Sequence, residues 1–104
     1  MSEIVVVAEI GIQPEKRAEA LAALEELCVQ THANDPGCHL YALQLDPTDE
    51  SRVFMIEKWE SPEALQAHGA SDHIKAFAGS GVLSGPPQVT VLDPAGYGDE
   101  KGMV

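Results

Sequence analysis

The sequence predicts an α+β fold of the ferredoxin-like kind, with a four-stranded antiparallel sheet and helices on one of its faces. The residue patterns of the segments and the order in which the segments follow one another support this prediction. Four segments are rich in β-branched and aromatic side chains, whereas two others place apolar residues at steps of three and four. The segments follow one another as strand, helix, strand, strand, helix, strand, which is the split strand–helix–strand arrangement.

The first half of the chain supplies a strand, a long helix and a second strand. Residues 4–12 are mostly β-branched and predict the first strand. Pro14 suits the first position of a helix and Glu15 suits its first turn, so we expect a helix from here to about residue 33. The sequence Asn34-Asp35-Pro36-Gly37 ends this helix, and residues 38–46 predict the second strand. The apolar face of the helix comprises Ala20, Leu21, Leu24, Leu27, Cys28 and Thr31.

A hairpin occupies the middle of the chain. The polar turn at residues 46–51 leads into a third strand at residues 52–60, and a fourth strand is predicted at residues 88–92. We therefore expect one domain over residues 1–93. The tail at residues 94–104 is rich in glycine and poor in apolar side chains, so we expect it to be mobile.

The second helix is predicted in two pieces. Ser61 is a suitable N-cap, and Pro62 follows it at the first helical position. The helical pattern breaks near Gly69, restarts at Ser71 and ends by residues 79–81.

The strands are apolar on both faces, whereas a sheet with helices on one side normally alternates apolar and polar residues. In the second strand, His39, Tyr41, Leu43 and Leu45 share one face, while Leu40 and Ala42 share the other. Two helices can cover only one face of the sheet. We therefore predict that a second copy of the chain covers the other face, giving a homodimer.

Composition excludes several classes of protein. The 104 residues suit one domain, and 17 acidic against 6 basic residues give a net charge of −11. Nucleic acids and anionic membranes bind clustered basic residues, so we expect neither as a partner. The longest apolar run is far shorter than the roughly 20 residues that span a bilayer. The acidic start Met1-Ser2-Glu3 is unlike a secretory signal, so we expect a cytoplasmic protein whose Cys28 and Cys38 are reduced thiols.

The four histidines are the first candidates for chemistry. His32 and His39 suit ordinary structural roles at a helix end and in a strand. His68 and His73 bracket the predicted helix break, where a cavity can open. They lie five residues apart, which is not one helical face, so the spacing predicts no metal site.

Two predicted strands carry further candidates. Trp59 ends a strand and could stack on a flat ligand, and the phenol of Tyr41 could hold a ligand oxygen. Glu57 lies in mid-strand on the same face as Trp59, where a carboxylate must be paired or have a raised pKa. Glu9 is its counterpart in the first strand. Nucleophile elbows and phosphate-binding loops are not found in the sequence.

Three segments together carry a specific motif. They are Asp35-Pro36-Gly37-Cys38-His39-Leu40-Tyr41, residues 54–68 with the sequence FMIEKWESPEALQAH, and Ser71-Asp72-His73-Ile74. This motif resembles the antibiotic biosynthesis monooxygenase family, in particular its small quinol monooxygenases, over about residues 3–93. The resemblance implies a dimeric α+β barrel built from two ferredoxin-like halves, in agreement with the strand pattern.

The resemblance also implies an oxygenase that works without flavin, haem or metal. An electron-rich phenol or quinol would react with O2 directly, and the protein would supply a dry pocket and a base. By matching position, Glu57, Trp59, His68 and His73 are cavity residues, and Tyr41 joins them. His73 or Glu57 would accept the phenol proton, Trp59 and Tyr41 would orient the ring, and His68 would orient substrate or oxygen. The partners are then a small aromatic substrate and O2.

Other functions are open on the same scaffold, because a fold and a cavity do not determine one reaction. A cofactor-free isomerase or an enzyme that processes a signal molecule is the main alternative. A protein that binds small aromatic ligands without turnover is the other. Oxygen consumption with reduced quinols, isomer interconversion without oxygen, and binding without turnover distinguish the three.

Overall fold

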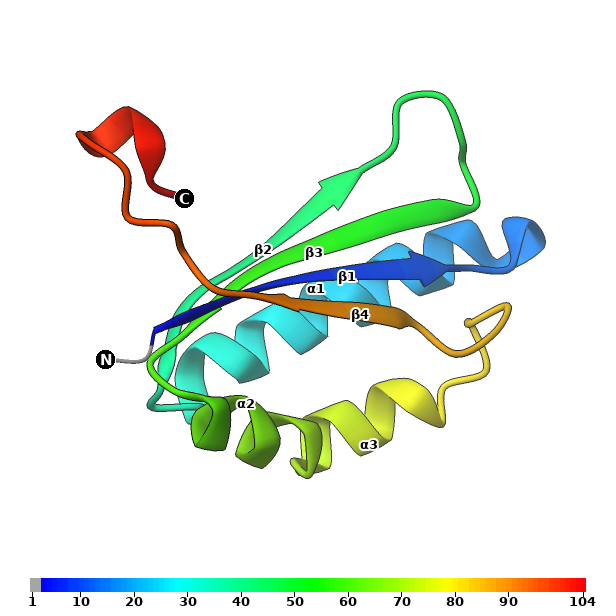
Figure 1. Cartoon of the computed structure of the whole chain (residues 1–104). Coiled ribbons are helices and arrows are strands. Elements are labelled where there is room, and N and C mark those ends of the chain that lie inside the picture. The colour runs from blue at the N-terminus through cyan, green and yellow to red at the C-terminus, as the bar shows by residue number, and fades with distance from the viewer. Residues whose placement is uncertain (1–2) are drawn as a thin grey trace.

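The computed structural model describes residues 3–104 and confirms the predicted α+β architecture (Figure 1). The four strands form one antiparallel sheet in the order β2-β3-β1-β4, and the helices lie on one face of it. The elements are β1 (Ile4–Gly11), α1 (Arg17–Asn34), β2 (Cys38–Leu45), β3 (Arg52–Trp59), α2 (Pro62–Gly69), α3 (Asp72–Ala78) and β4 (Gln88–Leu92), with short 3-10 helices η1 (Pro14–Lys16) and η2 (Glu100–Gly102).

The helix boundaries follow from local capping chemistry. Pro14 opens η1, the tight turn that leads into α1. Ser61 caps α2 by accepting a hydrogen bond on Oγ from the Ala64 N–H at 3.1 Å. Ser71 caps α3 in the same way, accepting from the Ile74 N–H at 3.3 Å. Each cap satisfies one of the N–H groups that a helix start leaves without a partner. The predicted break therefore separates two helices, α2 and α3, each of which begins at its own cap.

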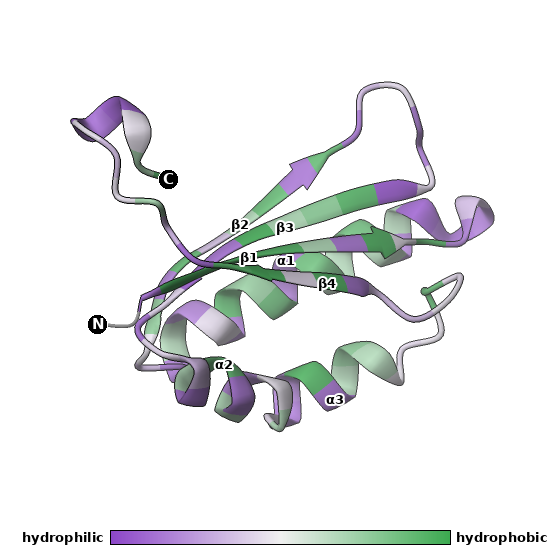
Figure 2. Ribbon diagram, in the orientation of Figure 1, coloured by the Kyte–Doolittle hydropathy of each residue, from purple (hydrophilic) through white to green (hydrophobic). Residues whose placement is uncertain are grey.

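The core lies between the helices and the inner face of the sheet. Strand register places Val6 of β1 and Tyr41 of β2 on either side of Glu57, so these three side chains share the inner face. Figure 2 shows how hydrophobic residues dominate β1 and β3. The largest fully buried side chains in this layer are Val6, Ile12, Leu24, Thr31, Val53, Met55 and Trp59.

Among residues 3–104, no α-helix covers the outer face of the sheet (Figure 1). Val7, Ala42, Phe54 and Ile56 lie on this face and are only half-buried. The segment after β4 reaches one end of it, where Lys58 Nζ donates to the Val104 carbonyl oxygen at 2.9 Å. No helix in residues 3–104 is long and apolar enough to cross a membrane.

Two strand residues lie differently from the sequence expectation. Glu9 pairs with Phe54 on the outer face, where its side chain is 41% exposed and lies 3.5 Å from Arg52. It is therefore not a buried counterpart of Glu57. A register irregularity between Cys38 and Leu40 displaces His39 to the surface, since one extra residue at such a point breaks the alternation of side chains.

Candidate functional site

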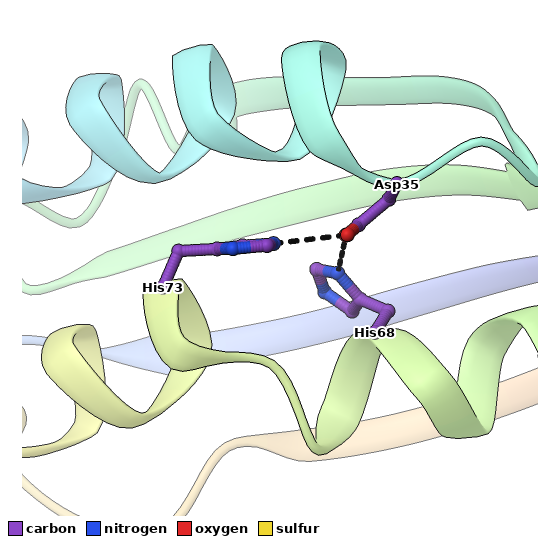
Figure 3. A group of neighbouring side chains, drawn as sticks. All are labelled: Asp35, His68 and His73. Carbon is purple, nitrogen blue, oxygen red and sulfur yellow. Dashed lines mark hydrogen bonds and ion pairs between the residues drawn. The ribbon is translucent and has the colours of Figure 1, made fainter.

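Asp35, His68 and His73 converge on one point from three different elements (Figure 3). Asp35 follows the last residue of α1, His68 lies in the last turn of α2, and His73 lies in the first turn of α3. His68 donates from Nδ1 to Asp35 Oδ2 at 2.6 Å. His73 donates from Nε2 to the same oxygen at 2.9 Å. One carboxylate oxygen therefore holds both imidazoles.

The break between α2 and α3 makes this convergence possible. In a continuous helix, residues five apart point roughly 140° away from each other. Here Ser71 Oγ donates to the His68 carbonyl oxygen at 2.6 Å and also caps α3, which turns the chain between the two histidines. Both rings then face Asp35. The spacing of the two histidines did not indicate this convergence, in which one possible ligand atom from each of Asp35, His68 and His73 lies within 4.8 Å of the others.

Burial and charge set the protonation of this cluster. The side chains of Asp35, His68 and His73 are only 13%, 6% and 11% exposed. Burial lowers the pKa of His68, and the nearby Asp35 carboxylate offsets this only in part. Burial raises the pKa of Asp35, but hydrogen bonds from both imidazoles outweigh it and hold that pKa below its ordinary value. At neutral pH the structure thus favours a charged Asp35 and a neutral His68, whose Nε2 carries the lone pair.

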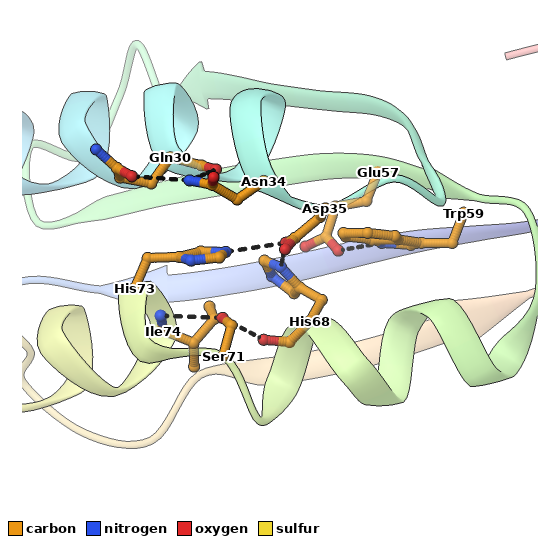
Figure 4. A network of polar contacts seen from close by, with 9 residues as sticks. All are labelled: Gln30, Asn34, Asp35, Glu57, Trp59, His68, Ser71, His73 and Ile74. Atoms are coloured by element: carbon orange, nitrogen blue, oxygen red, sulfur yellow. Dashed lines mark hydrogen bonds and ion pairs between the residues drawn. The ribbon is translucent and has the colours of Figure 1, made fainter.

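A second group of site residues lies directly behind His68 (Figure 4). The His68 ring centroid lies 4.6 Å from that of Trp59 and 5.0 Å from that of Tyr41. Trp59 Nε1–H donates to Glu57 Oε1 at 2.8 Å. Burial raises the pKa of Glu57 to about 7, although the bond from Trp59 opposes the rise. Burial also raises the pKa of Tyr41, and the Glu57 charge adds to this effect.

An open groove between α1 and α3 leads to the cluster. Its volume is about 690 Å³, and Asp35 and His73 both line it. His68, Glu57, Trp59 and Tyr41 are each 5% exposed or less and pack against one another behind the groove. The residues that line the groove are Ala23, Glu26, Leu27, Gln30, Asn34, Asp35, Ser71, Asp72, His73, Ala76, Phe77 and Ser80.

All five predicted site residues lie in one connected group. Glu57, Trp59, Tyr41 and His68 form its buried part, and His73 connects it to the groove through Asp35. Of the other two histidines, His32 bonds the Tyr41 carbonyl oxygen at 2.9 Å, and His39 bonds Glu3 at 2.7 Å, so both have structural partners.

Asp35 is the central residue that the sequence reasoning missed. In the sequence it belongs to an Asn-Asp-Pro-Gly run, which indicates only the end of a helix. Its partners lie 33 and 38 residues away. The signal that could have found it is the motif itself, because Asp35 stands first in the segment that resembles the family.

Known proteins are similar to this chain in sequence. The sequence profile described as "Antibiotic biosynthesis monooxygenase" matches residues 3–80. "Putative monooxygenase YcnE" of Bacillus subtilis is 33% identical over 88 residues, which is 83% of this chain and 92% of that protein. "Probable quinol monooxygenase YgiN" of Escherichia coli is 32% identical over 85 residues, covering 72% of this chain and 81% of the other.

Solved structures agree with the sequence comparison. A Caulobacter crescentus protein, described as a "putative antibiotic biosynthesis monooxygenase", superposes with a TM-score of 0.81 and 35% identity. The match covers 88% of this chain and 89% of that one. The profile match includes every residue of the site, from Asp35 to His73. From this match and the shared fold, the chain belongs to the antibiotic biosynthesis monooxygenase family.

Proposed function

We propose that this protein is a monooxygenase that oxidises a small aromatic quinol or phenol with O2, without a cofactor. The observation that carries the proposal is the site itself, where a buried carboxyl, two imidazoles and two aromatic rings lie together beside an open groove. A related protein is named as a quinol monooxygenase, which supports the substrate class. A groove of about 690 Å³ is within the range that holds a small aromatic molecule.

The reaction balances without an external reductant. The substrate loses two hydrogens, one oxygen atom of O2 enters the product, and the other leaves as water. The substrate therefore supplies all four electrons that reduce O2. The protein contributes a base that forms the electron-rich phenolate, together with a pocket that holds the ring and keeps out bulk water.

His73 is the base best placed to meet a substrate in the groove. It lines the groove, whereas Glu57 is buried behind His68 and Trp59. Asp35 accepts the His73 Nε2–H, which leaves Nδ1 as the ring nitrogen that can take the phenol proton. Trp59, Tyr41 and His68 pack against one another behind the groove, and in our proposal they orient the ring and the oxygen of a substrate that reaches this depth.

Oxygen uptake with a panel of reduced naphthoquinols tests this proposal. We expect at least one quinol to be consumed clearly faster than its spontaneous oxidation, with product that contains one atom of labelled O2. His73→Ala should reduce the rate by roughly 100-fold, the typical lower range for loss of a general base. His39→Ala is the matched control, since that imidazole is exposed and bonds only Glu3 among the described residues.

The alternatives predict different results in the same assays. An isomerase would interconvert its substrate without oxygen, and a binding protein would show saturable binding without turnover. If neither His73→Ala nor Glu57→Gln changed quinol-dependent oxygen uptake, the assigned bases would be wrong.

We also propose that a second copy of the chain covers the outer face of the sheet. The support is the half-buried apolar set on that face, to which β4 adds Leu92, a side chain that is 46% exposed and pairs with Val5. A contiguous apolar surface on a sheet face that no helix covers is typical of an interaction site. Light scattering should give twice the chain mass at low micromolar concentration, and a stable monomer would contradict the proposal.

A further inference from the structure

We propose that Asp35, His68 and His73 form a binding site for a transition-metal dication of the zinc type, such as Zn²⁺ or Co²⁺. Two imidazoles and one carboxylate are the donor set that borderline metal ions prefer in proteins. The proposal does not depend on the oxygenase function, because no step of that reaction uses a metal. The proposal concerns only the ability of these three side chains to bind a metal ion.

The geometry brings one ligand atom from each residue to a common point. The nitrogens of His68 and His73 lie 2.6 and 2.9 Å from Asp35 Oδ2, and all three atoms lie within 4.8 Å of one another. Ligand atoms around a tetrahedral zinc lie roughly 3.4 Å apart, since each bond is about 2.1 Å. Small rotations of the three side chains would therefore give bonding distances, without a change in the fold.

The hydrogen atoms now shared with Asp35 do not prevent binding. A neutral imidazole carries a single N–H, which can reside on either ring nitrogen. His68 can move its hydrogen from Nδ1 to Nε2, and His73 can move its own from Nε2 to Nδ1. The metal ion then replaces two hydrogen bonds to one carboxylate oxygen with two bonds to nitrogen and one to oxygen.

The surroundings favour a cation. The groove that leads to the cluster is lined by the carboxylates of Glu26, Asp35 and Asp72, and by no lysine or arginine. The whole chain carries a net charge of −11, which adds to the attraction. Because the groove is open at Asp35 and His73, an ion could enter there and retain water on its free positions.

The ligands are also held before any ion arrives. The Asp35 N–H donates to the Thr31 carbonyl oxygen at 3.1 Å, which fixes the residue at the end of α1. The His68 ring packs against Trp59 and Tyr41, and its carbonyl accepts from Ser71 Oγ. Such supporting contacts are what orient metal ligands in established sites, and they reduce the entropy lost on binding.

Calorimetric titration of the chelator-treated protein with ZnCl₂, and visible spectroscopy with CoCl₂, test the site. We expect one ion per chain and cobalt bands of a low-coordinate nitrogen–oxygen site. Asp35→Asn and His73→Gln should each weaken binding by at least about tenfold, because each removes one of three ligands. Two control variants should bind as the wild type does. One is Cys28→Ser with Cys38→Ser, which removes the thiols, and the other is His39→Gln, which removes an exposed imidazole.

Three outcomes would overturn the proposal. They are no binding to the wild type, equal binding by Asp35→Asn and His73→Gln, or loss of binding in the double serine variant. Circular dichroism checks that each variant is folded. Should the site variants not fold, histidine ring signals of the wild-type protein in NMR spectra decide instead. Zinc should shift those of His68 and His73, and shifts confined to His32 and His39 would equally refute the site.

Discussion

Glu57→Gln should make the protein more stable at alkaline pH and leave its stability little changed at acid pH. Glu57 is 5% exposed and lies on the inner sheet face between Val6 and Tyr41. Its hydrogen-bond donor among the described residues is Trp59 Nε1, at 2.8 Å. One hydrogen bond compensates only part of the cost of burying a carboxylate, so the folded protein favours the protonated acid.

The size of the effect follows from the pKa. Burial raises the pKa of Glu57 from 4.5 to about 7, and each pKa unit corresponds to about 1.4 kcal/mol. Because the folded pKa lies above the unfolded one, the stability that protonated Glu57 contributes is complete below about pH 4.5. It is lost as the pH rises through 7. The penalty on the wild type is thus about 1 kcal/mol at pH 5 and about 3 kcal/mol at pH 8.

Urea unfolding of wild type and Glu57→Gln at both pH values, followed by circular dichroism at one protein concentration, measures this. The variant should gain about 2 kcal/mol over the wild type between pH 5 and pH 8. The difference between the two proteins removes the contribution of Asp35 and His68 to the pH dependence of stability, because both proteins contain these residues. Working at one protein concentration keeps the extent of self-association the same in all samples.

Glu25→Gln is the control. Glu25 also lies in the middle of a regular element, but it is exposed on α1, on the opposite side of the sheet from the proposed interface. Its substitution should change stability by the same amount at both pH values. If the gain of Glu57→Gln over the wild type were also the same at pH 5 and pH 8, the reasoning from burial would be refuted.

Three further predictions concern packing, capping and assembly. A Cβ added at Gly37 would lie 2.4 Å from the Ala64 Cβ, so Gly37→Ala should lower the free energy of unfolding by about 1–3 kcal/mol in urea titrations; an unchanged value would contradict this close packing. Ser61→Ala removes the cap of α2 and should cost about 1 kcal/mol in the same assay, whereas Ser61→Asp should retain most of it. Ile56→Asp places a charge on the proposed subunit interface and should give a folded monomer by light scattering; a dimer of unchanged affinity would place the interface elsewhere.

Local sequence rules predicted the elements of this fold well, because each boundary depends on neighbouring residues. Pro14, Ser61 and Ser71 mark helix starts, and the structure places helical turns directly after each. The strands were predicted to within one residue, and β4 with the same bounds. Where the prediction failed, at His39, an irregularity in strand pairing was responsible, and pairing is not a local property.

The candidate site was only half predictable, for a physical reason. Glu57 and Trp59 are two residues apart in one strand, so alternation alone places them on the same face and allows the hydrogen bond between them. His68 and His73 could be ranked as candidates, but their direction depends on how the chain turns between α2 and α3. Local rules gave no reason to rank Asp35, since its role exists only after α1 packs beside α3.

The position of Asp35 also explains why two proposals of different kinds arise from one cluster. A carboxylate that accepts from two imidazoles fixes both tautomers, which a base needs, and it supplies the third donor, which a metal ion needs. The two uses exclude each other at His68 and His73, because Zn²⁺ would hold the rings in tautomers opposite to those that Asp35 selects. Zinc binding at this site should therefore inhibit quinol oxidation, and Asp35→Asn should weaken that inhibition. Inhibition that is equally strong in the variant would mean that zinc acts elsewhere.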